Sequence, residues 1–222
     1  MKKLNQNICF SIAIDGDSAS GKTTASKFIS KYFGFKLLTS GKLYRYLAYK
    51  IIKDNKKKLD KPYLKKITKN ITFKNLQNNK IMYTDEVTSY ASSIAKIKFI
   101  RKLLNKFQKK FSKNKKFIIE GRDIGSKILP NADLKLFFKC SPEEKAKRRL
   151  REYNKEKRKI TLKQVKKSLK KRDYSDKNRK ESPLIFVKGA VLVDTTKLTI
   201  KQMEAKLKKI VREAIKKKYG NL

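Results

Sequence analysis

Short apolar runs alternate along this chain with amphipathic stretches, and the alternation predicts an α/β domain. Residues 8–15, ICFSIAID, form a continuous apolar run of the kind found in a parallel strand that is buried on both faces. Apolar positions then recur at helical spacing from residue 22 to residue 33, and Gly34 stands where a glycine commonly ends a helix. Further apolar segments are expected to be strands at 35–39, 117–121, 134–139 and 190–195.

Helical patterns occur between these strands. The helix after residue 140 has the clearest start, because Ser141 is an N-cap residue, Pro142 suits the first helical position and Glu144 completes a capping box. Other helices are expected at 41–53 and 97–111 and from residues 161 and 199 onward. Five apolar strands that alternate with helices predict a five-stranded parallel sheet with helices on both sides, a three-layer α/β fold.

Residues 55–89 interrupt the alternation. A Lys-rich stretch is followed by the segments ITFKNL and KIMYTDEV, which Gln77-Asn78-Asn79 separates, and this pattern predicts a β-hairpin. We therefore expect an inserted lobe at 55–89 and a core domain made of residues 1–54 and 90–222.

A glycine-rich loop follows the first expected strand and precedes a helix. Its sequence, Gly16-Asp17-Ser18-Ala19-Ser20-Gly21-Lys22-Thr23, fits the phosphate-binding pattern G-x-x-x-x-G-K-[ST] in full. Backbone N–H groups and the helix N-terminus bind a phosphate chain, the two glycines let the backbone wrap it closely, and Lys22 adds a cation at the β and γ phosphates. Thr23 and Thr24 each offer a hydroxyl to Mg²⁺. The loop predicts a site for ATP with Mg²⁺.

The composition narrows the class of protein. Hydrophobic residues make up 39% of the 222 residues, with 12 Phe and 10 Tyr, which argues against a disordered chain. The absence of histidine excludes Ser-His-Asp hydrolysis, Cys-His proteolysis and His-ligated metals. No stretch approaches the roughly 20 apolar residues of a membrane span, and the first residues lack the apolar run of a secretory signal. We expect a cytoplasmic protein.

The formal net charge of +42 suggests a nucleic-acid-binding protein as an alternative. The lysines, however, are spread over every segment and form no patch interleaved with aromatic residues. We interpret them as solvated surface charge and expect no nucleic-acid partner. Only ten of the 61 cationic residues are arginines, so the position of each arginine is informative.

Seven of the ten arginines fall in a series of motifs that resembles the bacterial cytidylate kinases. The motifs are Thr39-Ser40-Gly41-Lys42-Leu43-Tyr44-Arg45, Ser92 with Arg101, Glu120-Gly121-Arg122-Asp123-Ile124-Gly125, Arg148-Arg149, and Arg172-Asp173-Tyr174-Ser175-Asp176-Lys177-Asn178-Arg179. Their order and spacing match over nearly the whole chain, and together they are more specific than the phosphate loop. The resemblance implies a P-loop kinase that transfers the γ-phosphoryl group of ATP to CMP or dCMP. It also implies that 55–89 is a nucleoside monophosphate-binding lobe and that about 148–160 is a short lid.

The resemblance implies a role for each matched residue. Lys22, Arg122, Arg148 and Arg149 would serve catalysis, the last two by closing over the donor phosphates. Arg45 and Arg179 would hold the monophosphate, while Ser92, Arg101 and Asp123 would contact the cytosine. The full acceptor set is Ser40, Tyr44, Arg45, Ser92, Arg101, Arg122, Asp123, Arg172, Asp176 and Arg179. Two planar N–H donors let each guanidinium grip phosphate oxygens bidentately, as an ammonium cannot.

Three positions depart from the family pattern, which has small residues inside the loop, glycine after the lysine and aspartate before Gly121. Asp17 and Thr23 stand in the loop, and Glu120 precedes Gly121. We expect the Asp17 carboxylate to point outward and Glu120 to reach Mg²⁺ through water. A kinase of another small acceptor, such as a different nucleotide or shikimate, stays an alternative. We expect small-molecule partners, no membrane partner and a monomer.

Overall fold

The computed structural model describes residues 8–56, 59–77 and 80–220 and divides into two compact units. One unit is formed by Met1–Leu37 with Asn114–Leu222, and the other by Leu38–Lys113. The lobe expected at 55–89 lies inside the second unit. That unit is larger than the expected lobe because the helices on either side of the lobe pack against the helices within it.

A five-stranded sheet is the centre of the fold, as predicted. Its strand order is β2-β3-β1-β4-β5, with β1 in the middle. β1 pairs in parallel with both neighbours, placing Ile12 beside Ile118 on one side and Ile14 beside Leu136 on the other, and β4 pairs in parallel with β5. The strands are β1 (Phe10–Gly16), β2 (Lys36–Thr39), β3 (Lys116–Glu120), β4 (Leu134–Lys139) and β5 (Val191–Asp194).

The apolar run of β1 is continuous because both faces of this strand are buried. Ile12, Ala13 and Ile14 are fully buried, and side chains of two helices, including Ile29 and Leu207, complete the cluster around them. Each such aliphatic side chain contributes about 1.5–3 kcal/mol by leaving water. The helices of this unit are α1 (Lys22–Phe33), the short helix η3 (Ile124–Ile128), α6 (Pro142–Lys155), α7 (Leu162–Asn178) and α8 (Ile200–Tyr219).

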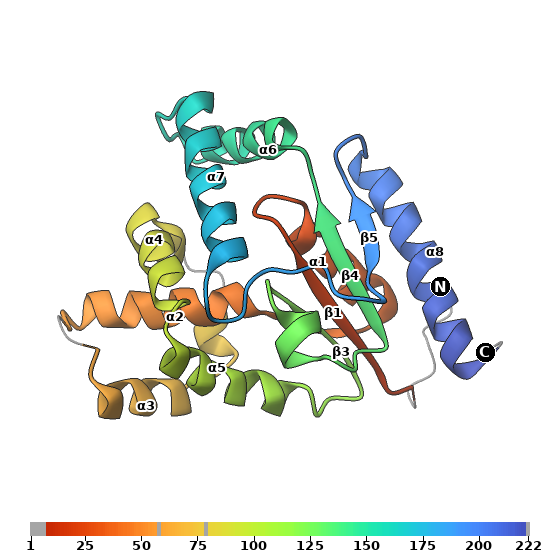
Figure 1. The fold of residues 1–222 in the computed structure, drawn as a ribbon, viewed down its shortest axis with the longest axis horizontal. Helices are drawn as coiled ribbons and strands as arrows, with labels where there is room; N and C mark the ends of the chain where they lie inside the picture. The colour runs from red at the N-terminus through yellow and green to blue at the C-terminus, as the bar shows by residue number, and fades with distance from the viewer. Residues whose placement is uncertain (1–7, 57–58, 78–79, 221–222) are drawn as a thin grey trace. The chain divides into compact units, whose positions relative to one another are not determined.

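Side chains fix the starts of three helices in this unit. The Ser141 hydroxyl accepts a hydrogen bond from the Glu144 N–H and begins α6, which starts beyond the arrowhead of β4 in Figure 1. Thr161 and Thr199 form full capping boxes at the starts of α7 and α8. Among the residues that the structure describes, none of the helices has an apolar stretch long enough to cross a bilayer.

The second unit is mainly helical, and the hairpin predicted in it is wrong. The segments expected as its two strands form the turns η1 and η2 and the start of α4, while Asn78 and Asn79 of the expected turn lie outside the described residues. Thr84 caps α4 by accepting from the Val87 N–H, and Asp85 and Glu86 in the first turn favour the helix. The elements are α2 (Ser40–Lys53), α3 (Lys61–Lys69), η1 (Lys74–Leu76), η2 (Lys80–Tyr83), α4 (Asp85–Ile94) and α5 (Lys98–Phe111).

Candidate functional site

The glycine-rich loop leaves the carboxyl end of β1, the central strand. Gly16 has a φ of 142°, and a Cβ built there would lie 2.1 Å from the carbonyl oxygen of Phe138 on β4. Ala19 and Gly21 also have positive φ, at 54° and 89°, so the chain turns tightly before α1 begins. Gly21 caps α1 without a side-chain hydrogen bond, which leaves the backbone N–H groups of the first turn to bind an anion.

The side chain of Lys22, the first residue of α1, lies within the phosphate loop that precedes it. It is 6% exposed, and its Nζ donates hydrogen bonds to the Asp17 carbonyl and, at 3.4 Å, to the Ser20 hydroxyl. Burial, and then the neighbouring Arg122, hold the pKa of Lys22 well below its usual value. An anionic phosphate chain would relieve both effects, since it supplies the counter-charge that the buried ammonium needs.

Thr23 and Glu120 form the oxygen-rich corner of the site. The Thr23 hydroxyl donates to Glu120 Oε1 at 2.8 Å, and the Ser26 hydroxyl donates to Glu120 Oε2 at 2.5 Å. Thr24 is exposed beside them. Hydroxyl and carboxylate oxygens suit Mg²⁺, whereas no cluster of three acidic or sulfur ligands occurs in the described part of the chain. The residues therefore fit a magnesium ion that brings most of its ligands with a nucleotide.

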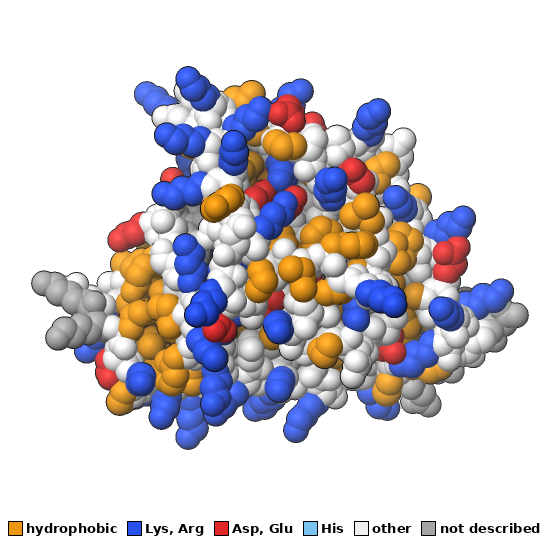
Figure 2. Space-filling view, viewed as in Figure 1, with side chains coloured by type: hydrophobic (Ala, Val, Ile, Leu, Met, Phe, Trp, Pro, Cys, Tyr) orange, Lys and Arg blue, Asp and Glu red, His pale blue; other side chains and the backbone are white. Residues whose placement is uncertain are grey.

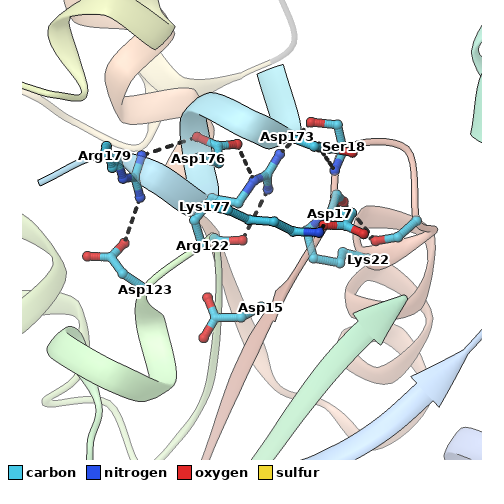
Figure 3. A network of polar contacts seen from close by, with 12 residues as sticks. Asp15, Asp17, Ser18, Lys22, Arg122, Asp123, Asp173, Asp176, Lys177 and Arg179 are labelled. Carbon is cyan, nitrogen blue, oxygen red and sulfur yellow. Dashed lines mark hydrogen bonds and ion pairs between the residues drawn. The ribbon is translucent and has the colours of Figure 1, made fainter. Parts of the chain in front are cut away.

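A second cluster of charges surrounds Arg122 beside the loop (Figure 3). Arg122 Nε donates to Asp176 at 2.8 Å, and its Nη2 donates to the Ser18 hydroxyl at 3.1 Å. Arg179 contacts Asp176 at 3.2 Å and lies 4.0 Å from Asp123. Burial would raise the pKa of Asp176, but Arg122, Arg172 and Arg179 together hold that pKa below its usual value. Four of the predicted substrate-binding residues of this unit therefore lie together: Arg122, Asp123, Asp176 and Arg179. A fifth, Arg172, is near enough to lower the pKa of Asp176.

Asp15, which the sequence analysis missed, binds the backbone next to Asp123 of this cluster. Its buried carboxylate accepts backbone hydrogen bonds from Ile124 at 2.9 Å and Gly125 at 2.7 Å, directly after Asp123. Burial raises the pKa of Asp15 to about 6. An acidic residue at the end of an otherwise apolar buried strand, just before Gly16, was the signal that could have identified it.

The two arginines of the expected lid, Arg148 and Arg149, differ in their surroundings. Arg148 donates to the Thr195 hydroxyl at 2.9 Å and to its carbonyl at 2.6 Å, and Thr195 in turn donates to the Ser20 carbonyl of the loop. Arg149 pairs with Glu152 on its own helix at 2.9 Å. Arg148 is therefore connected to the phosphate loop in this structure, whereas Arg149 is not.

The remaining predicted residues lie in the second unit. The Arg101 guanidinium lies over the Tyr44 ring, 5.7 Å from its centroid, and donates to the Ala95 carbonyl at 2.9 Å. Arg45 stacks in the same way over Tyr83, at 5.0 Å. Two serines complete the set: Ser40 is buried at the start of α2, and Ser92 is half-buried on α4.

Comparison with known proteins decides the family. A family model described as cytidylate kinase matches residues 12–213. The chain belongs to the cytidylate kinase family. A cytidylate kinase of Fusobacterium nucleatum subsp. nucleatum is 39% identical over 202 residues, which cover 86% of this chain and 92% of the relative. One from Thermotoga maritima is 34% identical over 218 residues, covering 92% and 97%.

A solved structure supports the fold of this cytidylate kinase family member. The crystal structure of an uncharacterized protein from Eubacterium ventriosum superposes with a TM-score of 0.55 at 14% sequence identity. The match covers 93% of this chain and 98% of the other. At this identity the likeness concerns the fold alone.

One expectation about the departures from the family pattern is wrong. Asp17 does not point outward; it is 5% exposed, and its carboxylate contacts Lys145 at 3.4 Å and Lys177 at 3.1 Å. Lys145 also contacts Asp173 at 2.6 Å, and Asp173 accepts the Ser18 N–H at 2.9 Å. An anion inside the loop is tolerated because two ammonium groups neutralise it. Sequence reasoning gave no role to either lysine.

Proposed function

We propose that this chain transfers the γ-phosphoryl group of ATP to CMP or dCMP, giving ADP and CDP or dCDP. The observation that supports this best is the 3.1 Å hydrogen bond between Arg122 and Ser18. It joins a guanidinium of the G-R-D motif to a residue of the phosphate loop. A kinase of this type brings two anionic nucleotides together, so it needs cations for the donor and for the acceptor within one site. The contact links Arg122, which is expected to contact the acceptor, to the loop that is expected to bind the donor.

The donor side of the reaction rests on the phosphate loop. Backbone N–H groups at the start of α1 bind the triphosphate, and Lys22 leaves the Asp17 carbonyl to contact the β and γ phosphates. The transferred group has spread negative charge in a loose transition state, so positioning and charge neutralisation are the main catalytic effects. Arg122 and Arg148, both connected to loop residues, supply that charge.

Magnesium and the lid complete the donor site. Thr23 or Thr24, with Glu120 behind Thr23, would hold Mg²⁺, which neutralises phosphate charge when it is bound. Arg148 and Arg149, at the start of the segment 148–160, would close over the phosphates and exclude water, which limits hydrolysis of ATP.

The acceptor side follows the family resemblance. Arg179 with Arg45 would hold the monophosphate, and Arg172, Asp176, Ser40 and Tyr44 would line its pocket. Asp123, together with Ser92 and Arg101, would read the base. A carboxylate accepts a hydrogen bond from the 4-amino group of cytosine. Uracil has a carbonyl oxygen at that position, so two hydrogen-bond acceptors would face each other and repel. We further propose that the protein is a cytoplasmic monomer.

A panel of acceptors tests the proposal. A coupled assay for ADP, with ATP as donor, compares CMP, dCMP, UMP, AMP and shikimate. We expect the largest kcat/KM for CMP or dCMP. A preference for any other acceptor would contradict the specificity, and no transfer to any of them would contradict the kinase assignment.

A matched pair of variants on α1 links the activity to the loop. Lys22→Ala should lower kcat at least 100-fold with an unchanged circular dichroism spectrum. Lys27→Ala removes an exposed ammonium from the same helix and should leave kcat within twofold. Equal effects of the two substitutions would remove Lys22 from the mechanism.

A further inference from the structure

Asp17 poses a problem for a loop that binds polyphosphate. It occupies the second position of the G-x-x-x-x-G-K-[ST] motif, and its side chain is buried. A carboxylate at low dielectric repels the phosphates of an incoming nucleotide much more strongly than it would in water. Some feature of this chain must offset that repulsion.

The offsetting charges come from α6 and α7. Lys145 of α6 contacts Asp17 Oδ2 at 3.4 Å, and Lys177 of α7 contacts Asp17 Oδ1 at 3.1 Å; Figure 3 shows the second of these pairs at the loop. Asp173 of α7 contacts Lys145 at 2.6 Å and binds the Ser18 N–H with its other oxygen. Two carboxylates and two ammonium groups therefore form a cluster with no net charge, anchored to the loop backbone.

The two lysines are not equivalent. The Lys145 side chain is 7% exposed, whereas that of Lys177 is 50% exposed. Solvent and salt screen an exposed ion pair strongly and a buried pair much less. Lys145 is therefore the buried cation beside Asp17, although Lys177 lies closer to it, and Asp173 fixes the position of the Lys145 ammonium at 2.6 Å.

We propose that Lys145 is a positioning residue for the phosphate donor: it keeps the Asp17 carboxylate paired toward α6, so that the loop binds ATP despite an acidic residue within it. This inference rests on the proposed function only in taking ATP as the donor. Lys145 need not touch the nucleotide, because it acts through Asp17.

A double-substitution cycle tests the proposal. The dissociation constant of ATP is measured by calorimetry, without an acceptor, for Lys145→Met, Asp17→Asn and the double variant. Lys145→Met should weaken ATP binding about 10- to 100-fold, because Asp17 loses its buried partner. Asp17→Asn alone should change it less than threefold. The double variant should bind ATP within threefold of Asp17→Asn, a rescue that a purely structural role of Lys145 would not produce.

Two further lysine variants serve as controls. Lys147→Met removes an exposed ammonium from α6 and should leave ATP binding within twofold. Lys177→Met should weaken binding less than threefold, because its pair is screened by solvent. An effect of Lys177→Met as large as that of Lys145→Met would contradict the argument from burial.

The outcomes separate this inference from the proposed function. If Lys145→Met does not fold, the double variant should fold and bind ATP as Asp17→Asn does; a double variant that stays unfolded or binds ten times more weakly contradicts the inference. Unchanged ATP binding in Lys145→Met, or no rescue in the double variant, also contradicts it. If the wild-type protein binds ATP but transfers nothing to CMP, the proposed function is wrong. The double-substitution cycle then still tests the role of Lys145, because it measures only ATP binding.

Discussion

Asp176 offers the sharpest test of how the acceptor site is organised. Its Oδ2 accepts from Arg122 at 2.8 Å and its Oδ1 contacts Arg179 at 3.2 Å, so one carboxylate orients two guanidinium groups. The family resemblance instead implies that Asp176 contacts the acceptor and its ribose. Asp176→Asn distinguishes these roles, because the amide has nearly the same shape but one acceptor oxygen and no charge.

The size of the effect follows from the two contacts. The amide oxygen can replace one carboxylate oxygen, while the NH₂ group faces the second guanidinium as a donor. One charge-assisted hydrogen bond is lost, about 2–3 kcal/mol for a pair in this buried setting. If that free energy is lost from the transition state, kcat/KM for the acceptor falls about 30- to 150-fold. The carboxylate is ionised at neutral pH in the wild type, because its neighbours lower its pKa.

The assay compares CMP with dCMP. If Asp176 orients Arg122 and Arg179, the arginines proposed to bind the phosphates, Asp176→Asn should lower kcat/KM for both acceptors by the same factor. The KM for ATP should change less than kcat/KM for the acceptor. A loss confined to CMP would show that Asp176 contacts the 2′-hydroxyl, and a change below threefold for both acceptors would refute the positioning argument.

Three further predictions concern single residues. Burial raises the pKa of Asp15 from 3.8 to about 6, so its contribution to stability is present below pH 4 and lost as the pH rises through 6. The unfolding free energy of the wild type minus that of Asp15→Asn, from urea titrations, should fall by about 2.4 kcal/mol between pH 4 and 7, and a flat difference would contradict this. Asp123→Asn should narrow the CMP-to-UMP ratio of kcat/KM about tenfold, and an unaltered ratio would place base recognition elsewhere. Thr23→Val should raise the Mg²⁺ concentration for half-maximal activity about tenfold and Thr24→Val less than threefold, since Thr23 contacts Glu120; the reverse order would assign the metal to Thr24.

The fold and the phosphate loop were predictable because local patterns determine them. The apolar run of β1 is buried on both faces, and Gly16 is required by a backbone contact that the motif already implies. The N-cap at Ser141 is likewise a local signal, and the structure confirms it, but the predicted capping box does not form. The Glu144 carboxylate accepts from Arg148 instead, and the Ser141 N–H donates to the Thr196 hydroxyl. Such features depend on residues a few positions apart, so the sequence displays them directly.

Other features depend on partners far apart in the chain. Lys145 is 128 residues from Asp17, and no periodicity connects them. Asp15 acts on backbone groups 109 and 110 residues away. In the second unit, α2 and α5 were predicted, but the start of α4 was missed for a different reason. KIMYTDEV has residues that favour strands, but the Thr84 cap and the packing of α4 against α2 favour a helix.

The position of the acidic residues suggests how a chain with a net charge of +42 keeps a precise anion site. Lysine and arginine side chains are scattered over the surface in view in Figure 2, between hydrophobic areas, and form no single patch there. Within the described residues, by contrast, every buried carboxylate belongs to the site: Asp15, Asp17, Glu120, Asp123, Asp173 and Asp176.

These carboxylates have a common effect. Each one that contacts a cation fixes the direction of that cation, and Asp15 and Glu120 fix backbone and hydroxyl groups in the same way. The surplus of positive charge on the surface attracts nucleotides from a distance and is screened by salt, but it cannot orient them. We therefore expect selectivity between two similar nucleotides to depend on the few buried carboxylates. Substitutions there should change specificity and turnover more than the removal of any single surface lysine.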